Sequence, residues 1–258
     1  STTYKRWYPH NIYKNMKDLK LMHYIVCIIL AVLVHTIYQV IIIPESIAIM
    51  SIAETNGQSL PRHFLIIIKD LEQEICIILF LIGFYLITYK IFQLNSKKYL
   101  FNVDFLEDIG SSKVSGEKAI LELEKLPQDI SSSPLIETLK ASLRRYMITD
   151  NVQNTSDAIT VSVNNLALKL DSENTMIRYL IWAIPSLGFV GTVRGIGQAL
   201  SNADKALAGD ISGMSQSLGV AFNSTFVALL ISLILMLLLH LLQKIEDNLL
   251  INIQSYSE

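Results

Sequence analysis

Hydroxyl and small side chains inside a long apolar stretch are the residues of this chain best suited to chemistry. Residues 184–196 read IPSLGFVGTVRGI and include Pro185, Gly188, Thr192 and Gly195. Small residues let the backbone of another helix approach closely, and a hydroxyl buried in lipid needs a hydrogen-bond partner. A helix that serves only as an anchor would use Leu, Ile and Val throughout. This segment is therefore predicted to pack tightly around something polar.

A second apolar stretch carries a matching set of residues, because side chains three, four and seven positions apart share one face of a helix. The two stripes predicted on this spacing are Pro185, Gly188, Thr192, Gly195 and Ala199 in the first stretch, and Ser217, Ala221, Ser224, Thr225, Ala228 and Ser232 in the second. A closed ring of such helix pairs would enclose a narrow axis lined by Thr and Ser, which predicts an ion pathway. Ordinary small-residue packing, with each hydroxyl bonded to a carbonyl of its own helix, is the alternative.

Ionisable residues are scarce in the apolar stretches, and none of them carries a carboxylate near its centre. Transfer of a proton or sodium ion across a membrane generally uses a carboxylate, so the titrating group is expected from another polypeptide. Arg194 is a candidate charge at the pore mouth, or an ion-pair partner of Asp204, Asp210 or a neighbouring subunit. His35 lies within the first apolar stretch, and we expect it to have an interfacial or packing role.

Several classes of function have no support in the sequence. Cys27 and Cys76 both lie in apolar stretches, which is typical of small buried residues rather than of a disulfide or metal pair. No nucleophile–base pair, metal-ligand spacing or phosphate-binding loop is present, so neither an enzyme nor a cofactor is predicted. The net charge of −2, with no cluster of Lys and Arg, gives no indication of nucleic-acid binding.

The composition and the length of the apolar stretches predict an all-α integral membrane protein with four transmembrane helices. The chain is 51% hydrophobic and 17% charged, whereas soluble domains contain about 25% charged residues. A spanning helix needs about 20 mostly apolar residues. The predicted division is a cytoplasmic N-terminal segment (1–22), a first span (23–44), a periplasmic segment (45–74), a second span (75–94), a cytoplasmic helical domain (95–175), a third span (176–201), a periplasmic connection (202–216), a fourth span (217–243) and a cytoplasmic tail (244–258).

The positions of Lys and Arg set the orientation, because short cytoplasmic flanks are enriched in these residues. They gather before the first span and after the second, which predicts that both termini and the domain between spans two and three are cytoplasmic. In that domain, apolar spacing predicts helices over 116–126 and 134–148. A further helix is expected to begin with a cap at Thr155 or Ser156 and to continue unbroken into the third span. Residues 61–74 are also predicted to be helical, as an extension of the second span.

Two motifs of the chain resemble those of a known family. Residues 184–196, IPSLGFVGTVRGI, are similar to the signature of the MotA/TolQ/ExbB proton-channel family, and residues 221–225, AFNST, resemble its second hallmark in the last span. The resemblance implies a homopentamer around two copies of a single-span partner of the MotB/TolR/ExbD type, whose membrane aspartate carries the ion. It also implies that Thr192 and Thr225 are the pore-facing hydroxyls and that the protein lies in a bacterial inner membrane.

The resemblance therefore predicts a ring subunit of an ion-driven rotary motor, with protons favoured over sodium ions. Four spans are typical of the flagellar MotA proteins, yet these commonly have Ala where this chain has Thr192. The chain thus combines a MotA-like topology with a pore motif of the TolQ/ExbB type. Three alternatives stay open, namely a passive membrane scaffold, a flagellar stator and a phage-defence stator of the Zorya type.

Overall fold

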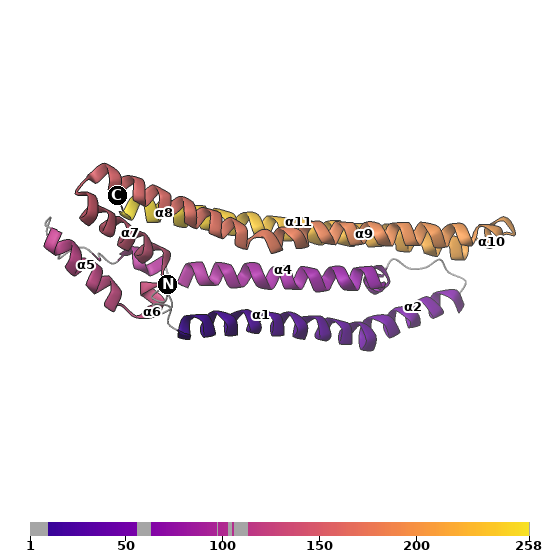
Figure 1. Ribbon diagram of the computed structural model, residues 1–258. Helices are drawn as coiled ribbons and strands as arrows, with labels where there is room; N and C mark the ends of the chain where they lie inside the picture. Colours follow the sequence, from indigo (N-terminus) through magenta and orange to yellow (C-terminus); the bar gives the residue numbers. More distant parts are fainter. Residues whose placement is uncertain (1–9, 56–62, 97, 103–104, 106–112, 258) are drawn as a thin grey trace, which may run out of the picture. The chain divides into compact units, whose positions relative to one another are not determined.

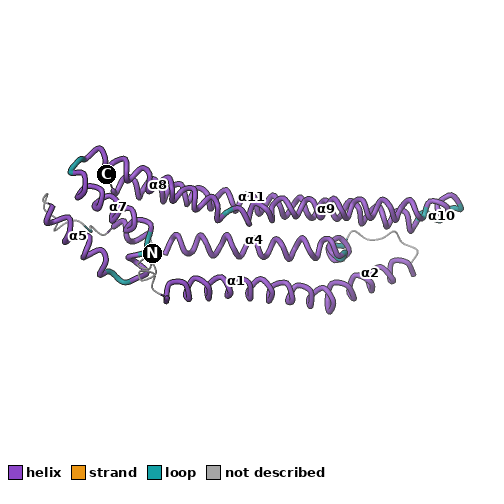
Figure 2. The backbone as a smooth tube through the Cα atoms, viewed as in Figure 1, coloured by secondary structure: helices purple, strands orange, loops and turns teal. Residues whose placement is uncertain are grey.

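A computed structural model describes residues 10–55, 63–96, 98–102, 105 and 113–257 of this chain. In these residues the secondary structure is helical, without a strand (Figures 1 and 2). Four segments within the described ranges are long and apolar enough to cross a membrane, Leu21–Ala53, Leu71–Phe101, Val152–Ser201 and Ser212–Ser257. The chain is an all-α membrane protein, which confirms the fold class predicted from composition and periodicity.

The chain divides into two compact units. The first unit contains residues 1–84 and 180–235, and the second contains residues 85–179 and 236–258. Three long helices, α4 (Leu71–Ser96), α9 (Thr175–Ser201) and α11 (Ser212–Ser257), contribute residues to both units. The candidate pore residues lie in the first unit, and the predicted cytoplasmic helices lie in the second.

In the first unit, the helix that contains the first predicted span does not end at Pro44, where that span was predicted to end. Helix α1 (His10–Ile37) continues through a π-helical turn, Tyr38–Ile42, into α2 (Ile43–Thr55). Proline cannot donate a backbone hydrogen bond, and its ring crowds the turn before it in an α-helix. Here the turn before Pro44 is the wider π turn, in which the Ile43 N–H donates to the carbonyl oxygen of Tyr38. The helix therefore accommodates the proline and runs on.

The segment before the second span is broken rather than continuous. Helix α3 (Phe64–Ile68) is followed by a bend, and α4 begins at Leu71, so the helix predicted over 61–74 is interrupted, and its first two residues lie outside the described ranges. The hydroxyl of Tyr38 donates to the carbonyl oxygen of Ile68 over 2.9 Å. This bond and an apolar cluster that includes Val34 and Val227 fasten α3 to α1 and α11. The start of α4 is thereby placed against the other helices of the unit.

Helices α9 and α11 lie side by side in the first unit because glycines of α9 meet small residues of α11 (Figure 1). A Cβ on Gly195 would lie 2.7 Å from the backbone nitrogen of Ala221, and one on Gly188 would overlap Ala228. Both glycines are fully covered by α11. The connection between the two helices contains a short helix, α10 (Ala203–Leu207). The backbones therefore approach as closely as the small-residue stripes predict.

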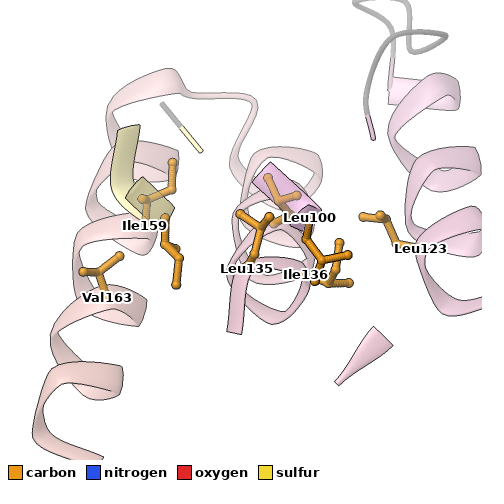
Figure 3. Packing of buried hydrophobic residues seen from close by; sticks show 8 residues of the cluster. Leu100, Leu123, Leu135, Ile136, Ile159 and Val163 are labelled. Atoms are coloured by element: carbon orange, nitrogen blue, oxygen red, sulfur yellow. The ribbon is translucent and has the colours of Figure 1, made fainter. Parts of the chain in front are cut away.

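The second unit is built on a short apolar core. It contains a 3-10 turn (Lys98–Asn102) and helices α5 (Lys113–Lys125), α6 (Gln128–Ser131), α7 (Pro134–Thr149) and α8 (Val152–Glu173). The helices predicted over 116–126 and 134–148 are thus confirmed by α5 and α7. Figure 3 shows the core of this unit, to which α5, α7, α8, α11 and the 3-10 turn all contribute. Its residues are Leu100, Leu123, Leu135, Ile136, Leu139, Ile159, Val163 and Ile253.

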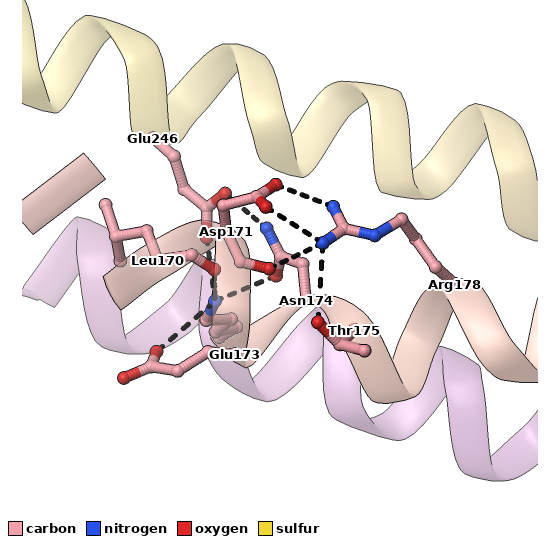
Figure 4. A network of polar contacts seen from close by, with 8 residues as sticks. Leu170, Asp171, Glu173, Asn174, Thr175, Arg178 and Glu246 are labelled. Atoms are coloured by element: carbon pink, nitrogen blue, oxygen red, sulfur yellow. Dashed lines mark hydrogen bonds and ion pairs between the residues drawn. The ribbon is translucent and has the colours of Figure 1, made fainter. Parts of the chain in front are cut away.

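One expectation about α8 is wrong. Its cap is Asn151, whose side-chain oxygen accepts hydrogen bonds from the backbone N–H groups of Gln153 and Asn154, and not Thr155 or Ser156. The long helix expected to continue into the third span is present as the run Val152–Ser201. A one-residue turn at Asn174 separates α8 from α9, but the Asn174 N–H still donates to Leu170 and the Arg178 N–H to Asn174, as in a continuous helix. Asn174, between them, takes part in the polar network of Figure 4.

Candidate ion-pathway site

The two predicted pore threonines lie together where α9 and α11 meet. Their hydroxyls are within hydrogen-bond distance of each other, and both side chains are only half buried in the single chain. The Thr192 hydroxyl also reaches the carbonyl oxygens of Ala221 over 3.0 Å and of Gly188 over 3.3 Å. The Thr225 hydroxyl reaches the same Gly188 oxygen over 3.3 Å. The sequence thus brings two hydroxyls, one from each stripe, to one point.

The hydrogen-bond capacity of this pair explains what it can do chemically. A hydroxyl has one proton to donate and two lone pairs that accept. Thr192 and Thr225 together have two protons to share among two backbone carbonyl oxygens and each other. Either hydroxyl can rotate to change which acceptor it uses. The pair can therefore donate to, or accept from, a third polar group brought to its exposed side.

The other predicted pore-lining residues pack helix on helix within one chain. Gly188, Gly195, Ala221, Ala228, Ser217 and Ser224 are buried, and Pro185 is half buried. The Ser217 hydroxyl donates to the carbonyl oxygen of Gly213 in its own helix over 2.9 Å. This arrangement agrees with small-residue packing, the alternative that the sequence left open for these positions. That they line a pore stays a prediction.

Arg194 has a partner that sequence reasoning missed. Its guanidinium lies 2.7 Å from a carboxylate oxygen of Glu72 and 3.9 Å from one of Asp70, and not beside Asp204 or Asp210, the partners within the chain that the sequence left open; a charge at the pore mouth stays a prediction. Asp210 instead accepts hydrogen bonds from the backbone N–H and hydroxyl of Ser212, which lower the pKa of Asp210. Glu72 was assigned to the segment outside the second span, and no local pattern connects it with a residue 122 positions away.

The first turn of α4 places three consecutive polar side chains against its neighbours. Glu72, Gln73 and Glu74 are 7%, 1% and 5% exposed. The Gln73 amide donates to the Ser224 hydroxyl over 3.2 Å, and a Glu74 carboxylate oxygen lies 2.7 Å from Nδ1 of His35. The carboxylates of this turn are therefore already engaged by side chains of the same chain.

A metal centre does not emerge from the geometry. In the described ranges no three or more His, Cys, Asp and Glu side chains cluster closely enough to hold a metal ion. Cys27 and Cys76 are free thiols, and Cys76 contacts the carbonyl oxygen of Ile184 over 3.6 Å. The chemistry available at the site is that of hydroxyls, backbone carbonyls, the Gln73 amide and the charged groups around Arg194 and Glu74.

Comparison with known proteins gives one match. The model of the MotA/TolQ/ExbB proton channel family matches residues 131–255, which include α7, α8, α9 and nearly all of α11. Residues 131–255 belong to the MotA/TolQ/ExbB family. Both threonines lie inside this region, whereas Glu72 and His35 precede it. No curated protein and no solved structure matches the chain. The resemblance inferred from the two motifs is thus confirmed, and with it a general role in an ion-channel or energising complex.

Proposed function

We propose that the chain is a ring subunit of an ion-driven rotary motor, in which ions pass a carboxylate of a partner beside Thr192 and Thr225. The observation that carries the proposal is the contact between these two hydroxyls, one from each small-residue helix, inside the region that matches the family. A carboxylate accepts hydrogen bonds, and a carboxylic acid also donates one. A hydroxyl pair that switches between donor and acceptor stabilises both forms, so the carboxylate can gain and lose its proton there.

The two buried carboxylates of α4 do not suit the exchange role. Glu72 is held by Arg194 and Glu74 by His35, each over 2.7 Å. Both acids are therefore already engaged by side chains of their own chain. The exchanging group therefore comes from a second polypeptide, for which we propose two copies of a single-span MotB/TolR/ExbD-type protein with a membrane aspartate.

The remaining parts of the proposal follow the family. We propose a pentamer of this chain in a bacterial inner membrane, with both termini in the cytoplasm and protons as the driving ion. Thr192 favours an energising role of the TolQ/ExbB type over a flagellar one, and a phage-defence stator of the Zorya type is the other candidate. A passive scaffold is the alternative from a different class, and its activity would not change when the membrane potential is collapsed.

The test replaces each threonine in the native complex, purified through this chain and reconstituted into liposomes that contain a pH-sensitive dye. Thr192→Ala and Thr225→Ala should abolish proton uptake driven by an imposed potential, because each removes one hydroxyl of the pair. The serine variants at both positions should retain uptake, because they keep the hydroxyl. Thr36→Ala is the matched control, since the Thr36 hydroxyl only donates to Val32 in its own helix over 2.8 Å.

Native mass spectrometry of each variant checks that the oligomer is intact. Full uptake by both alanine variants would refute the role of the threonines. Work by the complex that persists after a protonophore has collapsed the proton-motive force would favour the scaffold.

A further inference from the structure

We infer that the first turn of α4 is a latch that sets the register of Thr192 against Thr225, with Glu72 and Gln73 as positioning residues. The inference rests on the proposed function and names the residues that prepare its site. Two consecutive side chains of α4 reach the two threonine-bearing helices separately. Glu72 accepts from Arg194 of α9 over 2.7 Å, and Gln73 donates to Ser224 of α11 over 3.2 Å.

The sequence positions of these contacts place them on other faces of the same helix turns as the threonines. Arg194 follows Thr192 by two residues, which is about 200° around an α-helix, and Ser224 immediately precedes Thr225. Gly191 of α9 faces both α11 and α4. A Cβ on it would come within 2.5 Å of the Ser224 hydroxyl and 3.2 Å of Cγ of Glu72. A rotation of α9 about its axis would move Thr192 and break the ion pair together.

The burial of Glu72 makes the ion pair hard to break. Its side chain is 9% exposed, whereas the Arg194 side chain is 40% exposed. A buried carboxylate that loses its cation is left uncompensated in a medium of low dielectric constant. The neutral partner, Gln73, fixes α11 in the same way but without charge. Helices α9 and α11, which carry the two threonines, are thus each bonded to α4 by a separate side chain.

A substitution at Gln73 also separates an effect on the position of the threonines from an effect on the stability of the fold. The side-chain oxygen of Gln73 is buried and has no hydrogen-bond partner within the described part of the chain. An unsatisfied buried oxygen destabilises the fold. Gln73→Leu removes that oxygen together with the amide bonds to Ser224 and to the carbonyl oxygen of Ile67, each over 3.2 Å, so the gain from the lost oxygen offsets part of the stability that the two bonds contribute. Its effect on the threonines should nonetheless be large if the turn is a latch.

The register is measured directly by disulfide formation between Thr192→Cys and Thr225→Cys in a chain that carries Cys27→Ala and Cys76→Ala. Because the two side chains are in contact, an oxidant should join them within one chain, and maleimide labelling reports the thiols that remain. In this background Glu72→Gln, Arg194→Gln and Gln73→Leu should each slow the reaction by roughly 5- to 30-fold.

Two further variants and a control sharpen the result. Arg194→Lys keeps the cation and should restore the rate. Glu72→Gln combined with Arg194→Gln removes both charges of the ion pair, so neither is left unpaired. The double variant should recover part of the cross-linking rate. Arg178→Gln is the matched control, because Arg178 is also in α9 and also pairs over 2.7 Å, but with the exposed Asp171 in the second unit. It should leave the rate unchanged.

Proton uptake by the native complex with the same latch substitutions, and with both threonines present, completes the test. Slower cross-linking together with lower uptake supports the latch. Parental cross-linking rates in Glu72→Gln, Arg194→Gln and Gln73→Leu, with the oligomer intact, would overturn it, whatever the uptake. Slower cross-linking with parental uptake would keep the latch and overturn the proposed role of the threonines.

Discussion

At the scale of single residues, space and hydrogen-bond capacity decide what the helix pair can do. Gly195 lets α9 approach the backbone of Ala221, and that approach brings Thr192 to Thr225. Gly197, only two residues further, has nothing within 4 Å of the place where its Cβ would be. The same residue type therefore has a packing role at one position and none at the other.

Replacement of these two glycines by alanine should have opposite effects on stability. Gly195→Ala forces a methyl group against the backbone of α11 and should destabilise the fold by about 1–3 kcal/mol, as overpacking does. Gly197→Ala meets no atom and should stabilise the helix by roughly 0.5–1 kcal/mol, because alanine favours the helix more than glycine does. Thermal unfolding of the purified protein in detergent measures both. Equal effects would show that α9 and α11 do not pack as closely as described.

At the scale of elements, a buried polar network holds the junction of α8 and α9. The Lys90 ammonium lies 2.8 Å from Glu246 and 2.8 Å from the side-chain oxygen of Asn174, and it contacts Glu173 over 3.4 Å. The Asn174 amide donates to the second oxygen of Glu246 over 2.6 Å. Lys90 and Glu246 are 12% and 6% exposed. The side chain of Asn174, at the one-residue turn, thus has its two polar partners on α4 and α11.

Removal of Lys90 should be the most damaging single change in this network. Lys90→Met leaves the buried Glu246 without a cation and should cost about 3–5 kcal/mol. Lys90→Met with Glu246→Met should cost less than Lys90→Met alone, since no unpaired charge remains. Arg144→Met is the control, because its pair with Glu124 has the same 2.8 Å separation but is exposed, which limits its contribution to about 0–1 kcal/mol. Denaturant unfolding compares the three, and a double variant less stable than Lys90→Met would contradict this account.

The network also explains why sequence reasoning found the elements but misplaced their ends. The helices around 116–126 and 134–148 follow from local apolar spacing, which needs no partner. The one-residue turn at Asn174 has its side-chain partners in Lys90 and Glu246, which are 84 and 72 positions away and so are not visible to local spacing. Continuation through Pro44 depends on a π turn that apolar spacing does not reveal. The pairing of Thr192 with Thr225 was accessible because both belong to small-residue stripes, whereas Glu72 belongs to no stripe.

At the scale of the whole molecule, the parts of the candidate site have two origins along the chain. The region that matches the family, residues 131–255, contains both threonines and Arg194. Glu72, Gln73 and His35 lie before it. Both carboxylates of α4 are already engaged, Glu72 by Arg194 and Glu74 by His35. The proposed motor therefore needs a second polypeptide to conduct.

Liposomes that contain this chain alone should accordingly be no more permeable to protons than empty ones. Liposomes that contain the native complex should take up protons when a potential is imposed, because the partner then supplies the carboxylate. The pH-sensitive dye inside the vesicles measures both, and replacement of sodium by choline outside distinguishes a sodium-driven complex. Steady proton uptake by the chain alone would contradict the assignment of the exchanging group to a partner.

The ion pair between Arg194 and Glu72 has a consequence for any attempt to exchange parts between relatives. A graft limited to residues 131–255 would transplant the arginine and leave its counter-ion behind. The recipient would then carry an orphan cation next to its hydroxyls, unless its own second span supplied an acid at the same depth. A functional chimera must therefore include more than the family region, and the transferred segment must begin at the acidic first turn of α4.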